Sequence, residues 1–234
     1  MAFFTAEHLT YSYPNGLRAL DDVSFSIEDG DCVGLVGANG AGKSTLLALL
    51  CGLLLPVSGT AEIGGVPLCK ANLAQIRSRI GLVFQNPDDQ LFMPTIREDV
   101  AFGLQNRGYS AEQIAKKVTD TLEHLQIEHL APRAPYQLSG GEKRSAALAT
   151  VLAMDPHMVL FDEPTAFLDP RSKRNFTQLL QSMTAARLVA THDIELVKRA
   201  CNRVLVLHCG RLLADEAPDR AFSDEALMER AELI

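Results

Sequence analysis

The chain has 234 residues, of which 47% are hydrophobic and 22% charged. This composition is typical of a globular protein and excludes the disordered, collagen-like and disulfide-scaffold classes. Acidic residues outnumber basic ones by 29 to 22, which gives a net charge of −7. The chain therefore lacks the broad positive surface that nucleic-acid binding needs, and we expect no nucleic-acid partner.

The first structural signal along the chain is an alternation of apolar and polar residues. Val23, Phe25 and Ile27 alternate with polar positions, which predicts a strand with one solvated face and an antiparallel layer near the N-terminus. Short continuous apolar runs follow. They cover residues 32–36, 80–84, 158–161 and 188–190. Such runs are typical of parallel strands that are buried on both faces.

Helical patterns separate these runs. Residues 110–130 carry one apolar face, Ser110 with Gln113 forms a capping box, and Pro132 ends the helix. We find no convincing strand between residues 86 and 156. The sequence therefore predicts one domain over 1–234, with an α/β core from 1–85 and 157–234 and a helical subdomain inserted at 86–156. The acidic tail, 215–234, is expected to form a solvated terminal helix.

An uncharged stretch at residues 44–61 is the one candidate for a membrane span. Gly52 and Pro56 interrupt it, and it falls short of the roughly 20 apolar residues that crossing requires. If the protein works at a membrane, another subunit must cross it. The acidic start of the chain also lacks the layout of a secretory signal.

The five cysteines include no CxxC pair, which indicates reduced thiols in a cytoplasmic protein. Metal binding by Cys201, His208 and Cys209 is conceivable. Their spacing matches no standard metal site, so packing is the favoured interpretation.

Residues 37–45 fit the phosphate-loop pattern GxxxxGK[ST], between a strand-like run and a helix-like run. The glycines allow backbone N–H groups to turn toward phosphates, Lys43 can reach the β and γ oxygens, and Ser44 offers a hydroxyl to Mg²⁺. The alternative is a glycine-rich turn before a core helix. The order of strand, loop and helix favours a nucleotide site.

Two acids follow the apolar run at 158–161. Asp162 is predicted to hold Mg²⁺, and Glu163 is placed to polarise the attacking water as a general base. The alternative is a solvated turn before Pro164. The phosphate loop favours the catalytic interpretation.

A second helix start lies at Leu138-Ser139-Gly140-Gly141-Glu142. Ser139 and Glu142 make a capping box, but two glycines in a first helical turn cost about 1 kcal/mol each relative to alanine. Bare backbone at a helix N-terminus suits an anion. Because one nucleotide cannot fill two distant phosphate-binding helix starts, we expect the Ser139 loop to close over the nucleotide held by Lys43 of another copy.

Together these motifs resemble the ATP-binding subunits of ABC transporters over essentially the whole chain. The resemblance implies a P-loop NTPase (RecA-like) core with an N-terminal antiparallel β layer and an inserted helical subdomain, binding ATP and Mg²⁺. It also implies an aromatic stacked on adenine at Tyr13 (or Tyr11), a Q-loop at Gln85, a D-loop at Asp169 and a switch histidine at His192. Each has a simpler alternative: Tyr13 could be a packed strand residue, Asp169 a helix N-cap before Pro170, and His192 a strand-end turn.

The site residues fall into three sets. The expected nucleotide contacts are Tyr13, Gly37, Asn39, Gly40, Gly42, Lys43, Ser44, Thr45, Ser139, Gly140, Gly141 and Asp169. The expected catalytic residues are Lys43, Gln85, Glu163 and His192. The expected Mg²⁺ ligands are Ser44, Gln85 and Asp162.

Two residues depart from the family pattern. The family more often has glutamine where Glu142 stands and a small residue where Phe167 stands. Both positions are expected near the dimer seam. They leave open whether the partner is an identical copy or a close paralogue.

Residues 85–103 look like the Q-loop region of energy-coupling-factor importers, which take up cobalt, nickel or vitamins. Leu91, Phe92 and Met93 form an apolar triplet that is a candidate docking surface, unless it packs inside the helical subdomain. The resemblance is somewhat closer to cobalt and nickel systems than to vitamin systems such as those for biotin. It implies a transmembrane coupling subunit, a substrate-binding membrane subunit, and a peripheral location on the cytoplasmic face of the membrane.

Two other classes stay open at this point. A soluble ABC ATPase in DNA repair or translation usually carries a long coiled-coil insertion or a second cassette, and neither is visible here. A small-molecule kinase would leave the Ser139 helix start and His192 without a role.

Overall fold

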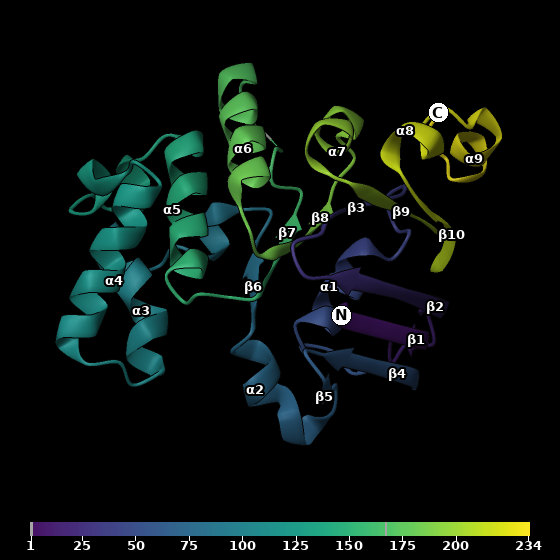
Figure 1. Cartoon of the computed structure of the whole chain (residues 1–234), viewed down its shortest axis with the longest axis horizontal. Helices are drawn as coiled ribbons and strands as arrows, with labels where there is room; N and C mark the ends of the chain where they lie inside the picture. Colours follow the sequence, from purple (N-terminus) through teal and green to yellow (C-terminus); the bar gives the residue numbers. More distant parts are fainter. Residues whose placement is uncertain (1, 167) are drawn as a thin grey trace.

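In the computed structural model, which describes residues 2–166 and 168–234, two β-sheets form the centre of the molecule (Figure 1). The first is an antiparallel sheet with the order β2-β1-β4-β5. Its strands are β1 (Ala2–Ser12), β2 (Arg18–Glu28), β4 (Ser58–Ile63) and β5 (Val66–Pro67). The predicted antiparallel layer is confirmed, and Val23, Phe25 and Ile27 are its buried positions on β2.

The second sheet has the order β10-β9-β3-β8-β7-β6 and is parallel except for β10. Its strands are β3 (Cys32–Val36), β6 (Ile80–Val83), β7 (Met158–Asp162), β8 (Ala186–Ala190), β9 (Arg203–His208) and β10 (Arg211–Glu216). The continuous apolar runs therefore form buried parallel strands, as predicted. The fold is that of a P-loop NTPase, with the phosphate-binding turn after β3.

Helices cover both faces of the second sheet. One hydrophobic cluster joins the antiparallel sheet, α1 (Lys43–Leu50) and one face of the parallel sheet. A second cluster packs the other face against α6 (Pro170–Ser182), α7 (Ile194–Ala200), α8 (Pro218–Ala221) and α9 (Glu225–Arg230). The short α2 (Leu73–Arg77) precedes β6.

Residues 86–156 contain no strand and form a third cluster. Its helices are α3 (Ile96–Asn106), α4 (Ala111–His124) and α5 (Gly140–Leu152), which lie together at one end of the molecule (Figure 1). A short 3-10 turn at Pro87–Asp89 precedes α3, and two more, at Glu128–Leu130 and Pro135–Gln137, lie between α4 and α5. The Ser110 capping box is present, but the helix ends at His124, because Gln126 takes a left-handed conformation with φ 57°.

The expectation of a solvated helix at the acidic C-terminal tail is wrong. Residues 211–216 form an edge strand, and α8 and α9 pack onto the core through the buried side chains of Ala221, Leu227 and Ala231. The acids occupy the outer positions of these helices, which explains why composition alone suggested a solvated segment.

Within the described residues, no helix combines the length and the apolar character needed to span a membrane.

Candidate functional site

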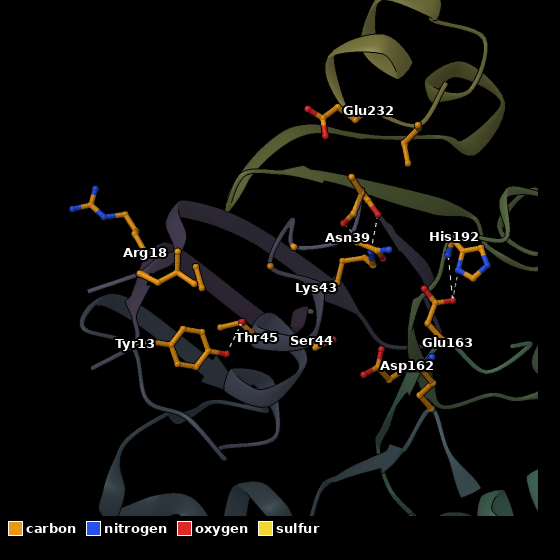
Figure 2. Close-up of a pocket in the computed structure, with 18 of the residues that line it drawn as sticks. Tyr13, Arg18, Asn39, Lys43, Ser44, Thr45, Asp162, Glu163, His192 and Glu232 are labelled. Atoms are coloured by element: carbon orange, nitrogen blue, oxygen red, sulfur yellow. Dashed lines mark hydrogen bonds and ion pairs between the residues drawn. The ribbon is translucent and has the colours of Figure 1, made fainter. Parts of the chain in front are cut away.

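A cavity of about 850 Å³ opens where β3, β7 and β8 end. Parallel strands place their carboxyl ends on one edge of the sheet, so residues far apart in the sequence meet there. The cavity brings together predicted residues from the phosphate loop, the Q-loop, β7 and the turn after β8: Gly37, Asn39, Gly40, Gly42, Lys43, Ser44, Thr45, Gln85, Asp162, Glu163 and His192. Figure 2 shows several of these side chains around the cavity.

Two glycines of the phosphate loop are required by close backbone contacts. A Cβ at Gly37 would lie 2.2 Å from the carbonyl oxygen of Leu207. A Cβ at Gly42 would lie 2.6 Å from that of Ala19, and Gly42 has φ 109°, a conformation that L side chains rarely adopt. The loop therefore passes against β9 and β2 before it opens α1.

Lys43 is the first residue of α1, and its ammonium is held within the loop. The Nζ atom donates to the carbonyls of Gly37 at 2.6 Å and Ala38 at 3.2 Å. Burial lowers the pKa of Lys43, while the charges of Glu163 and Asp162 oppose that shift. The amine therefore lies between the loop and the acidic end of β7.

Asp162 and Ser44 supply adjacent oxygen atoms. Burial raises the pKa of Asp162, and the negative charge of Glu163 raises it further, whereas the hydrogen bond with Ser44 and the charge of Lys43 lower it. A partly buried carboxylate beside a hydroxyl, with the amide of Gln85 lining the same cavity, is a set of hard oxygen donors. Such a set fits Mg²⁺, whose remaining positions are filled by water and phosphate.

Glu163 is fixed by the turn after β8. Its Oε2 accepts hydrogen bonds from Thr191 Oγ1 at 3.1 Å and from the backbone N–H of His192 at 3.3 Å, and it lies 2.9 Å from His192 Nδ1. The side chain of Glu163 is 13% exposed and that of His192 is 75% exposed. Figure 2 shows the pair side by side at the cavity edge.

The backbone at Glu163 is strained, with φ 45°. A non-glycine residue in this region costs on the order of 1–3 kcal/mol, and such strain concentrates at functional sites. The backbone N–H of Glu163 donates to the carbonyl of Ala190 at 2.8 Å, which fixes this conformation. The strained residue is the one that the sequence assigns as general base.

Of the two candidate tyrosines, Tyr13 lines the cavity and Tyr11 does not. Tyr11 is buried in β1, and its ring meets that of Tyr13 edge-on at 5.1 Å. The hydroxyl of Tyr13 lies 3.0 Å from Thr45 Oγ1 on α1, a contact visible in Figure 2. Tyr13 is therefore placed to receive a base that extends from the phosphate loop.

Ser139, Gly141 and Asp169 line a second cavity of about 900 Å³, which shares no lining residue with the first. Gly140 begins α5 beside Ser139, and a Cβ there would meet nothing within 4 Å. The capping box is real, because Glu142 Oε2 accepts from both the backbone N–H and the hydroxyl of Ser139. These hydrogen bonds lower the pKa of Glu142.

Asp169 is the N-cap of α6, with Oδ1 accepting from the backbone N–H groups of Arg171 and Ser172. The structural interpretation of this residue is thus confirmed, and the cap places it on the second cavity. Phe167, the other departure from the family pattern, lies outside the described residues.

The sequence did not identify six residues that line the first cavity. They are Leu17, Arg18, Ala19, Ile194, Glu232 and Leu233. Residues 17–19 line the first cavity because β2 begins beside the phosphate loop. Glu232 and Leu233 reach it because the chain after α9 passes the cavity, and Figure 2 shows Glu232 on the C-terminal segment above the phosphate loop. No local motif marks either segment.

The apolar triplet is divided by the fold. Leu91 is buried in the helical cluster, whereas Phe92 is 63% exposed and meets Phe102 edge-on at 5.0 Å. Beneath Phe92, Asp99 Oδ1 accepts from the backbone N–H groups of Phe92 and Met93 at 3.0 Å. Phe92, Asp99 and Phe102 line a groove of about 230 Å³, so only part of the triplet is available for docking.

Among the described residues, no three or more histidine, cysteine, aspartate or glutamate side chains form a group that could hold a metal ion. Cys201 is buried beside Cys32, with the sulfur atoms 3.6 Å apart, and Cys209 is exposed next to His208. These contacts favour packing for Cys201, as the sequence indicated.

Comparison with known proteins identifies relatives that cover nearly the whole chain. The family model described as ABC transporter matches residues 20–166. The energy-coupling factor transporter ATP-binding protein EcfA of Methanococcus maripaludis is 39% identical over all of this chain and 86% of its own length.

Two solved structures extend the comparison to the fold. CbiO1 from Clostridium perfringens, part of the ABC transporter complex CbiONQ, is 33% identical with a TM-score of 0.87, covering 99% of this chain and 95% of that one. The dimeric ATP-binding cassette MJ0796, bound to ADP and phosphate, is 30% identical with a TM-score of 0.81, covering 92% and 98%.

Proposed function

We propose that this chain powers the import of cobalt or nickel ions. The chain belongs to the ABC transporter family and is an ATP-hydrolysing subunit of the energy-coupling-factor type. The observation that carries the mechanism is the separation of two phosphate-binding helix starts into two cavities of one chain. The preference for cobalt or nickel rests on the resemblance of residues 85–103 and on the similarity to CbiO1. A vitamin such as biotin is the alternative cargo.

In this mechanism the first cavity holds ATP. Tyr13 receives the adenine, the backbone of Gly37 to Gly42 surrounds the phosphates, and Lys43 neutralises the β and γ oxygens. Ser44, Asp162 and the amide of Gln85 would hold Mg²⁺, which neutralises charge on the phosphates when bound.

Glu163 then acts as the general base. Its carboxylate takes a proton from the attacking water, and the donors from Thr191 and His192 keep Oε2 in place. Because Nδ1 of His192 faces Glu163, Nε2 is the ring nitrogen available to the γ-phosphate. His192 therefore connects the base to the transferred group.

The second cavity closes over the nucleotide of a partner copy. The N-terminus of α5, with Ser139, Gly140 and Gly141, contributes N–H groups and a partial positive charge toward the γ-phosphate. ATP thus holds the dimer closed, and hydrolysis removes the group that bridges the two chains. The chain lies at the cytoplasmic face of the membrane, and membrane subunits docked at Phe92 and its groove move as the dimer closes and opens.

The test is complementation between two inactive variants. Lys43→Ala removes the phosphate contact of the first cavity, and Gly140→Asp places a carboxylate at the second, where the backbone has room for it. Each variant alone should release little phosphate. In a 1:1 mixture half of the dimers are mixed, and each mixed dimer has one intact site of two, so about a quarter of parental activity should return if the sites act independently.

Val57→Asp is the matched control, because it adds a carboxylate at an exposed position outside both cavities and should keep parental activity. Mixed dimers that form yet release no phosphate would contradict the shared site. The cargo is tested separately, by identifying the membrane subunits that co-purify and measuring uptake of labelled cobalt and nickel ions against biotin.

A further inference from the structure

The segment after β6 is attached to α5 by a buried arginine. Arg144 donates from Nη1 to the carbonyl of Phe84 and from Nη2 to the carbonyl of Gln85, each at 2.6 Å. Two parallel donors on one planar group fix the direction of the backbone that they bind. The main chain of the Q-loop glutamine is therefore held by the helix that begins at Gly140.

Burial of the Arg144 side chain costs free energy. Arg144 is only 3% exposed, it has no carboxylate partner among the ion pairs of the described residues, and its Nε has no hydrogen-bond partner. A buried cation without a counter-ion costs several kcal/mol before its hydrogen bonds are counted. The two carbonyls are its compensation, so the contact is specific rather than incidental.

A second anchor acts on the same segment. Gln90 Oε1 accepts from the backbone N–H of Phe84 at 3.1 Å, and its Nε2 donates to Ala147 O and Thr150 Oγ1, both at 2.8 Å. Ala147 and Thr150 lie on α5. The segment from Phe84 to Gln90 is thus bound to α5 and must follow it.

Arg144 also lines the second cavity, together with Ser139 and Gly141, whereas Gln85 lines the first. We infer that Arg144 is a positioning residue for Gln85. When the start of α5 binds the nucleotide of the partner copy, Arg144 moves the backbone of Gln85 into its working position in the first cavity. This inference rests on the proposed function. Its consequence is a physical link between the two nucleotide sites of a dimer.

The experiment measures kcat, KM and ATP affinity of the purified full chain for Arg144→Met, Gln85→Ala and the double variant. Arg144→Met should lower kcat by about 10- to 100-fold, the effect of misplacing one reacting group, while KM changes by less than about twofold. In the Gln85→Ala background the same substitution should lower kcat no further, because the side chain that it positions is gone. A purely structural role would give multiplicative losses.

Two further variants complete the design. Arg144→Lys keeps the cation but can reach one carbonyl at a time, so its kcat should lie between those of the parent and Arg144→Met. Lys143→Met removes the neighbouring cation of α5 and its surface pair with Asp88, and it should leave kcat within about twofold because exposed pairs contribute little.

The outcomes separate the two proposals. If the parent chain releases no phosphate, the proposed function fails. If the parent is active and Gln85→Ala is slowed but Arg144→Met is not, only the positioning role is overturned. Multiplicative losses in the double variant, a normal kcat in Gln85→Ala, or loss of ATP binding in both Arg144→Met and Arg144→Lys would also overturn it.

Discussion

Glu163→Gln tests the chemistry of the first cavity with the smallest change available. The amide has the shape of the carboxylate and keeps an oxygen that can accept from Thr191 Oγ1 and the backbone N–H of His192. It cannot take a proton from water. Because general-base catalysis contributes about 10²- to 10⁴-fold, we expect kcat to fall by that factor.

The fold should tolerate this change. A hydrogen bond to a charged acceptor contributes about 1 kcal/mol more than one to a neutral acceptor, so two such bonds give a loss of about 2 kcal/mol. Relief of the repulsion between Glu163 and Asp162, which raises the pKa of Asp162, offsets part of it. For a chain of this size the melting temperature should then fall by no more than about 8 °C.

The assay combines phosphate release with light scattering after size-exclusion chromatography, in the presence of ATP and Mg²⁺. Glu163→Gln should bind ATP with parental affinity and elute as a dimer, whereas the parent chain returns to monomer as ATP is consumed. Asp162→Asn is the matched comparison, because it should lose ATP affinity as well as turnover. Parental turnover in Glu163→Gln would refute the assignment of the base, and a monomer that binds ATP would refute the closure of the dimer by nucleotide.

Three other substitutions test separate parts of the molecule. Tyr13→Ala should weaken ATP binding by roughly 1–3 kcal/mol of stacking, measured by calorimetry, and an unchanged affinity would exclude adenine stacking. Phe92→Asp should abolish co-purification with membrane subunits without changing ATP affinity. Val57→Asp, at a similarly exposed position, should keep co-purification. If both variants lose co-purification equally, the docking assignment of Phe92 is wrong. Asp99→Asn should raise the melting temperature at neutral pH, because Asp99 Oδ2 is buried without a partner and burial raises its pKa. A raised pKa means that the folded state binds the proton more tightly than the unfolded state, so the parent chain loses stability as the pH rises through that pKa. The difference in melting temperature between Asp99→Asn and the parent chain should therefore become smaller on acidification. A difference that does not change with pH would contradict this.

Strands β3, β6, β7 and β8 and the phosphate loop were predictable because their information is local, whereas the parallel strand β9 (Arg203–His208) was not predicted. Continuous apolar runs occur in sequences whose strands are buried on both faces. Residues 37–45 carry strand, loop and helix signals in immediate succession. The capping boxes at Ser110 and Ser139 are equally local, and both are present.

β1 was missed because its pattern is broken. His8 takes φ 54°, and the pairing with β2 shifts register between Ala6 and Leu9, so the alternation changes phase within the strand. The same strand explains why Tyr11 and Tyr13 could not be separated. Residues two apart share a face of a strand, but β1 ends at Ser12. Tyr13 begins a turn in which its backbone N–H donates to the carbonyl of Leu17.

The position of the C-terminal residues was missed for a different reason. Leu227, Met228 and Ala231 have helical spacing, but the surrounding acids dominate the composition, and nothing local shows which surface they cover. Leu227 and Ala231 pack on the face of the parallel sheet that α6 and α7 also cover. Contacts of Glu232 and Leu233 with the first cavity depend on that packing, so they could be found only from the three-dimensional structure.

The segment after β6 brings the three functional surfaces into one short stretch of chain. Gln85 lines the nucleotide cavity, Gln90 is bonded to α5, and Phe92 lies on the exposed groove. Only six residues lie between Gln85 and Phe92, and Arg144 binds the backbone of Gln85 to α5, the helix at the second cavity. A force applied at Phe92 by a membrane partner therefore cannot move the groove without moving Gln85 or straining the Arg144 contacts. In the proposed mechanism, chain connectivity and these two buried anchors would couple docking to hydrolysis.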